Sequence, residues 1–143
     1  MRDSIIIERN IKAPIDQVFK ALVRPEELVK WHHAGDGWFT PHANVDPKVG
    51  GKISIGYSSA DGAQSFEFGA IISEYDPPKR LAYYLQLKEP IKKESRLVTY
   101  DLSENNDITH LRLEFDIEHV NDKELQRKGW TEHIDNLENL LRK

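Results

Sequence analysis

The last amphipathic stretch of the chain, residues 129–141, constrains the fold more than any other feature. Trp130, Ile134, Leu137 and Leu141 follow the i, i+4, i+7, i+11 spacing of one helical stripe, and polar residues occupy the other faces. A helix with a single apolar stripe has to bury that stripe against another element. Because the stretch follows a run of strand patterns, we expect a long C-terminal helix packed on a curved sheet.

Length and composition exclude several classes of protein. The 143 residues predict a single domain, residues 1–143, that is large enough for a hydrophobic core. The formal net charge is −4 without a basic stripe, so we do not expect nucleic acid as a partner. There is no cysteine, which excludes disulfides, thiolate metal sites and cysteine nucleophiles.

The N-terminus and the hydropathy pattern predict a cytoplasmic protein. Charged residues occur too early in the segment from Met1 to Glu8 for a signal peptide. No apolar run approaches the length that crosses a bilayer, so membrane insertion is not expected.

The first third of the chain predicts one strand, two short helices and a loop. Ser4 to Ile11 is rich in β-branched residues and predicts the first strand. Pro14 and Pro25 each begin a short helical stretch, because proline suits the first turn of a helix. From His32 to Val49 regular spacing fails, and the glycine and proline residues there predict a long loop.

Residues 53–117 alternate between apolar and polar with a period of two, which is the pattern of half-buried strands. Turn signals at Asp61-Gly62, at Asp76-Pro77-Pro78 and at residues 104–107 divide this region into hairpins. Consecutive hairpins predict an antiparallel sheet with one packed face. We therefore expect an α+β fold: an antiparallel curved sheet of about six strands wrapped on the long C-terminal helix, with two short helices after strand 1. Asn121 or Asp122 is expected to cap the last helix.

Short motifs along nearly the whole chain give it a family resemblance. They are Ala13-Pro14 with Val18-Phe19, Trp31, Gly50-Gly51-Lys52-Ile53, Asp61-Gly62 with Phe66-Glu67-Phe68-Gly69, Pro78-Lys79-Arg80-Leu81, Val98-Thr99, and Gly129-Trp130 with Leu137. Each motif alone is weakly specific. Together they resemble START-like (SRPBCC) domains of the family called activator of heat-shock protein 90 ATPase homologue.

The resemblance implies a fold more than a function. Residues 31–38 and 124–130 resemble one bacterial branch of the family, whose members mostly carry the family name without a demonstrated activity. The family fold is the helix-grip (START/birch-pollen-allergen-like) fold, with an apolar cavity under the last helix and often a homodimer. The eukaryotic co-chaperones use a separate N-terminal domain for much of their chaperone contact. Because 143 residues leave no room for it, heat-shock protein 90 is not expected as a partner.

The resemblance and the strand alternation together predict a ligand-binding cavity between the last helix and the sheet. Its expected lining comprises Trp31, Trp38, Ile53, Ile55, Tyr57, Phe66, Phe68, Tyr83, Leu85, Tyr100, Leu113, Phe115, Trp130, His133, Ile134 and Leu137. The alternative is that these side chains fill the space at the ordinary density of a protein core. The sequence does not separate a hollow core from a filled one.

A few polar side chains could orient a ligand in such a cavity. Tyr57, Tyr83 and Tyr100 can each bury a ring and present a hydroxyl. His133 borders the stripe of the last helix and could form a hydrogen bond or transfer a proton near neutral pH. The alternative for His133 is a half-exposed position on the flank of the helix.

Histidine and aspartate residues of the predicted loop are the candidates for a metal site. They are His32, His33, Asp36, His42 and Asp46, all of residue types that bind zinc or iron. They lack the i, i+4 spacing of a helical histidine pair, and Asp36-Gly37 and Asp46-Pro47 are ordinary turn sequences. We therefore expect no metal and no cofactor.

The sequence favours binding of an apolar or amphipathic small molecule in the cavity, without catalytic residues. One alternative is a cyclase- or hydrolase-like enzyme that uses His133 or a tyrosine as acid or base. Another is a stress or chaperone-accessory module that binds proteins through an apolar patch near Trp38 and Phe39.

Overall fold

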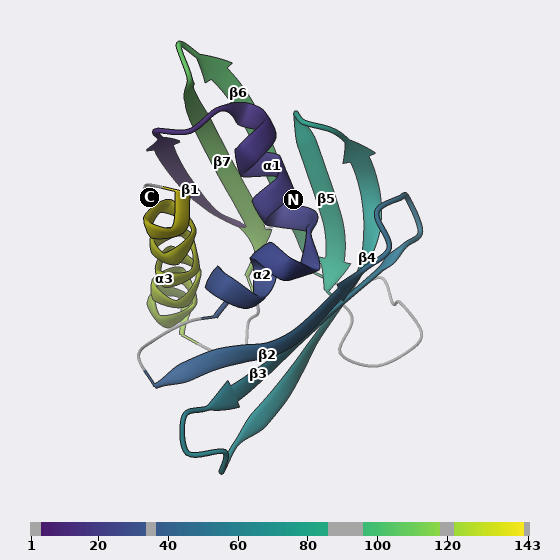
Figure 1. Ribbon diagram of the computed structural model, residues 1–143, viewed down its shortest axis with the longest axis vertical. Coiled ribbons are helices and arrows are strands. Elements are labelled where there is room, and N and C mark those ends of the chain that lie inside the picture. The colour runs from purple at the N-terminus through teal and green to yellow at the C-terminus, as the bar shows by residue number, and fades with distance from the viewer. Residues whose placement is uncertain (1–3, 34–36, 86–95, 118–121, 142–143) are drawn as a thin grey trace.

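The computed structural model describes residues 4–33, 37–85, 96–117 and 122–141, which form one curved sheet and three helices (Figure 1). The elements are β1 (Ser4–Ile11), α1 (Ile15–Val23), α2 (Pro25–Trp31), β2 (Trp38–Val45), β3 (Lys52–Ser59), β4 (Ser65–Asp76), β5 (Arg80–Leu85), β6 (Leu97–Asn105), β7 (Ile108–Asp116) and α3 (Lys123–Leu141).

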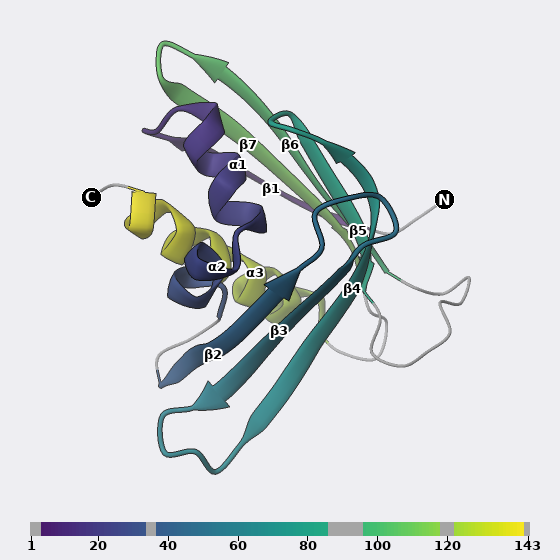
Figure 2. The same ribbon diagram turned by 45° about the vertical axis from the view of Figure 1, so that its right-hand side comes forward.

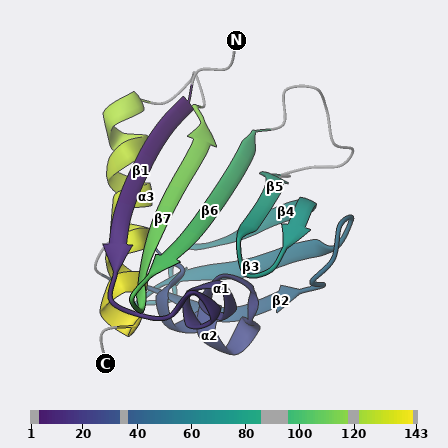
Figure 3. The same cartoon turned by 90° about the horizontal axis from the view of Figure 1, so that it is seen from above.

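The seven strands form a single antiparallel sheet in the order β1-β7-β6-β5-β4-β3-β2. Each strand from β2 to β6 pairs with the next strand along the chain, and β1 forms the other edge of the sheet beside β7. The sheet curls around the helices, with α3 beside β1 and α1 and α2 across the open side (Figures 2 and 3). The predicted α+β architecture is confirmed.

The apolar stripe of α3 faces the sheet as its spacing predicts. Ile134 and Leu137 are completely buried, and Trp130 and Leu141 pack against the core from partly exposed positions. The helix begins with the predicted cap, because Oδ1 of Asp122 accepts hydrogen bonds from the backbone N–H groups at the start of α3.

Ion pairs hold α3 against β1. The guanidinium of Arg9 lies 2.8 Å from Oδ1 of Asp135 and 2.9 Å from Oε1 of Glu138. These two carboxylates on successive turns raise the pKa of Arg9, although partial burial opposes them. The ion pairs therefore link α3 to β1 at the edge of the buried stripe.

The prediction of a loop from His32 to Val49 is wrong in its middle, where the structure has strand β2. With β2, the sheet has seven strands rather than about six. Strand β2 lies at the sheet edge, and its register shifts between Phe39 and His42. Pro41 falls within this bulge, where its missing N–H breaks no regular ladder. The proline and the bulge hide the period of two, and pairing with β3 makes the segment a strand.

Candidate functional site

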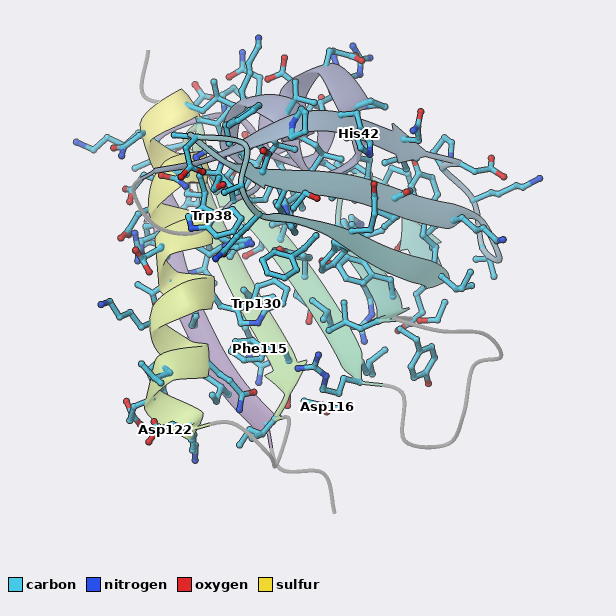
Figure 4. All side chains as sticks on the ribbon, turned by 90° about the horizontal axis from the view of Figure 1, so that it is seen from below. Trp38, His42, Phe115, Asp116, Asp122 and Trp130 are labelled. Carbon is cyan, nitrogen blue, oxygen red and sulfur yellow. The ribbon has the colours of Figure 1, made fainter. Side chains whose placement is uncertain are left out.

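A pocket of about 180 Å³ opens where α3 meets the ends of β2, β3 and β4. Its walls are His33, Trp38, Tyr57, Phe66 and His133, and we call it the α3 pocket. Figure 4 shows Trp38 near α3, with Trp130 and Phe115 together farther along the helix. Helix α3, the segment after α2, the start of β2 and the β3–β4 hairpin therefore each contribute to the pocket.

Two aromatic rings form the outer wall. Trp38 stacks on Phe66 with ring centroids 5.6 Å apart and an angle of 27° between the rings. Phe66 stands directly opposite Tyr57 in the antiparallel pair of β3 and β4, so the same register places both at the pocket. Phe66 is 60% exposed, which leaves the apolar wall open to solvent at its rim.

The inner wall contains a hydrogen-bonded pair. The Tyr57 hydroxyl lies 2.7 Å from Nδ1 of His32, and the two rings stack 5.9 Å apart. His32 is 2% exposed, and burial together with the nearby His133 lowers its pKa well below the usual value. Burial raises the pKa of Tyr57, so its hydroxyl stays protonated at neutral pH.

His133 lies on α3 next to this pair. Its ring packs edge-on against His32 at 4.7 Å and lies 5.4 Å from the ring of Trp130. Its Nδ1 is 3.0 Å from the backbone carbonyl oxygen of Gly129, one turn earlier in the helix. Burial lowers the pKa of His133 to about 4, despite the opposing effect of this hydrogen bond.

The α3 pocket therefore combines apolar walls with uncharged polar groups. Burial also lowers the pKa of His33, so the three imidazoles are neutral at pH 7. A neutral imidazole can accept a hydrogen bond or a proton through its bare nitrogen. The Tyr57 hydroxyl is already hydrogen-bonded to His32. The arrangement suits an uncharged ligand that has a polar edge.

The predicted lining residues divide into a packed core and a pocket wall. Trp38, Tyr57, Phe66 and His133 line the α3 pocket. Phe68, Leu85 and Trp130 pack against the core from partly buried positions. The others lie in the core itself: Trp31, Ile53, Ile55, Tyr83, Tyr100, Leu113, Phe115, Ile134 and Leu137.

Sequence reasoning missed His33 as a wall residue and His32 as the partner of Tyr57. Both follow α2 directly, and the sequence pattern indicates them only as candidate metal ligands. The burial of Trp31, whose Nε1 donates to the carbonyl of Ala21, draws this end of α2 into the fold. No periodicity in the sequence indicates where the chain turns after that residue.

Below the pocket, the core contains two more tyrosines. Burial raises the pKa values of Tyr83 and Tyr100. The Tyr100 hydroxyl is enclosed and has no hydrogen-bond partner of ordinary geometry in the described part of the chain, although Tyr83 is close enough to affect its pKa. Both hydroxyls lie in the core rather than in the pocket wall.

The candidate metal ligands are not gathered together. Nε2 of His42 lies 2.8 Å from Glu67 on the exposed surface, and Asp46 pairs with Lys48. Asp36 lies outside the described residues. Within the described ranges, no three His, Cys, Asp or Glu side chains are placed to hold a metal ion.

The helices of the described part of the chain include none that is long and apolar enough to span a membrane.

Solved structures of other proteins resemble this chain over nearly its whole length. The AHSA1-like protein from Aeromonas hydrophila is 26% identical, with a TM-score of 0.85 over 95% of this chain and 90% of that chain. Chr148 from Cytophaga hutchinsonii is 27% identical, with a TM-score of 0.77 over 96% and 90% of the two chains. CV1439 from Chromobacterium violaceum shares the fold at 22% identity, with a TM-score of 0.84 over 99% of each chain. A comparison with curated proteins finds no match.

The family assignment rests on the sequence as well as on the fold. Residues 12–142 match the family described as "Activator of Hsp90 ATPase homolog 1-like protein". This match spans nearly the whole chain and confirms the resemblance that the short motifs indicate. The chain therefore belongs to the Activator of Hsp90 ATPase homolog 1-like protein family.

Proposed function

We propose that this protein binds a small, largely apolar molecule in the α3 pocket. The observation that carries the proposal is a concave site walled by three aromatic side chains and two imidazoles, beside an otherwise packed core. Binding sites for small molecules have this composition. The ligand would insert between Trp38 and Phe66 on one side and His133 on the other.

The volume limits the size of the ligand. Pockets that enclose drug-sized molecules have volumes of roughly 300–1,000 Å³, and a cavity of about 150 Å³ holds benzene. The 180 Å³ of the α3 pocket therefore suits one or two fused rings. Burial of roughly 200 Å² of apolar surface, at about 25 cal/mol per Å², contributes about 5 kcal/mol, and the cost of association makes the Kd weaker than the roughly 0.2 mM that this figure alone gives.

A titration with benzofuran, an uncharged two-ring probe, tests this proposal. Trp38→Ala removes one wall and should weaken binding about fivefold to tenfold, because an aromatic contact contributes about 1 kcal/mol. Phe39→Ala is the matched control, since Phe39 is a neighbouring aromatic on β2 that does not line the pocket. Ligand-observed NMR measures the three affinities.

Two results would refute the proposal. Benzofuran could fail to bind the wild-type protein at concentrations up to its solubility. Alternatively, Phe39→Ala could weaken binding as much as Trp38→Ala does, which would place the probe on the exposed edge of β2 rather than in the pocket.

A further inference from the structure

The hydrogen bond inside α3 determines which nitrogen of His133 carries the proton. Nδ1 of His133 lies 3.0 Å from the carbonyl oxygen of Gly129. A carbonyl oxygen only accepts hydrogen bonds, so Nδ1 must be the donor. With one proton on the neutral ring, Nε2 is a bare acceptor.

Nε2 of His133 is also accessible. Across the described residues, the Tyr100 hydroxyl is the one fully enclosed side-chain nitrogen or oxygen that has no partner. His133 makes its one hydrogen bond through Nδ1, so Nε2 is unpartnered without being enclosed. His133 is also one of the walls of the α3 pocket.

Of the other polar groups nearby, one pair is already hydrogen-bonded and one imidazole makes only a long contact. The Tyr57 hydroxyl and Nδ1 of His32 are bonded to each other. His33 makes a long contact of 3.5 Å from Nδ1 to Thr40 and none through Nε2 to the described residues, so it is the second candidate acceptor and has to be tested beside His133. Among the described residues that line the pocket, none is Asp, Glu, Lys or Arg. From these described residues a charged ligand would gain no opposite charge to offset the loss of its hydration.

We propose that the α3 pocket selects neutral, flat aromatic compounds that carry an N–H or O–H group, and that this group donates a hydrogen bond to Nε2 of His133. The inference rests on the proposed function and deepens it, because it names the ligand class. Phenols and indole-like heterocycles belong to this class. Aromatic carboxylates and purely hydrocarbon rings do not.

Indole and benzofuran distinguish the ligand class from simple apolar binding. The two probes have nearly the same shape, but only indole has an N–H donor. At pH 7.5 we expect wild-type protein to bind indole about tenfold more tightly than benzofuran, as one buried hydrogen bond implies. In His133→Phe the preference should disappear: the ratio of the two affinities should fall to about one, whatever the change in their absolute values.

His33→Phe is the matched control, because it removes the other imidazole of the pocket wall. The preference for indole should survive in this variant, even if both affinities change. A preference lost in His33→Phe and kept in His133→Phe would overturn the assignment to His133.

A spectroscopic readout on the wild-type protein needs no variant. The measurement is the nitrogen-15 chemical shift of the His133 imidazole. When indole is added, the Nε2 signal should move toward the value of a hydrogen-bonded nitrogen, and when benzofuran is added it should stay in place. Equal affinities for the two probes, together with no shift of Nε2, would overturn the inference and leave the proposed function standing. If neither probe binds, both the inference and the proposed function are wrong.

Discussion

Gly51→Ala is expected to lower the free energy of unfolding by about 3 kcal/mol and the melting temperature by about 10 °C. A Cβ on Gly51 would overlap the backbone carbonyl oxygen of Asp46 and come within 2.9 Å of that of Lys48. Both obstacles are backbone atoms, so no side-chain rotation relieves the overlap. Thermal unfolding followed by circular dichroism measures the effect.

The turn from Asp46 to Gly51 cannot easily move aside, because its backbone forms hydrogen bonds within the turn and to β4. The Gly51 N–H donates to the carbonyl of Lys48 at 2.9 Å. The Gly51 carbonyl accepts from the N–H of Ile72, and the Gly50 N–H donates to the carbonyl of Ile72. Relief of the overlap would break the attachment of this turn to β4.

Gly129→Ala is the control for this substitution. Gly129 lies inside α3, and a Cβ there meets no atom within 4 Å. Alanine in a helix interior is more favourable than glycine by roughly 0.8–1 kcal/mol, so this variant should be slightly more stable than wild type. Equal stability of the two variants would contradict the account of the turn at Gly51.

Acidification from pH 6.5 to pH 4 is expected to destabilise the fold by about 3 kcal/mol through His133 alone. Its pKa is about 4 in the folded protein and about 6.5 in the unfolded chain. Between these values the unfolded state binds a proton that the folded state does not, so stability is full above pH 6.5 and falls as the pH falls. His32 and His33 also have lowered pKa values and act in the same direction.

Denaturant unfolding at a series of pH values measures this loss. In His133→Phe the dependence on pH should become shallower over the same window, because one of the three imidazoles no longer titrates. A wild-type stability that stays constant between pH 6.5 and 4, or an unchanged slope in the variant, would show that His133 accepts protons as readily folded as unfolded.

The sequence predicts most of this fold because periodicity reports burial directly. The stripe of α3 and the alternation through β3 to β7 each describe one buried face, and pairing follows from short hairpin turns. Strand β2 escaped prediction because Pro41 and the bulge interrupt its alternation. An edge strand of this kind is held in its extended form by pairing with the neighbouring strand, here β3.

The candidate site is less accessible to sequence reasoning. Alternation places Ile55, Tyr57, Phe66 and Phe68 in register on β3 and β4, yet only Tyr57 and Phe66 line the pocket. The difference depends on where the β3–β4 hairpin extends away from the rest of the sheet (Figure 1). That divergence is a property of sheet curvature, which a pattern with a period of two does not contain.

The orientation of His133 also could not be predicted from the sequence. Its position beside Ile134 is compatible with an exposed helix flank or with a pocket wall. The outcome depends on the segment after α2, which brings His32 against the ring of His133. No spacing rule relates residues that are about a hundred positions apart.

The location of a bound ring tests the central claim most directly. With benzofuran in excess, we expect intermolecular nuclear Overhauser effects from the probe to the ring protons of Phe66, Tyr57 and His133, the walls of the α3 pocket. The exposed ring of Phe39 should show none. Effects confined to Phe39, or to any surface away from α3, would contradict the account.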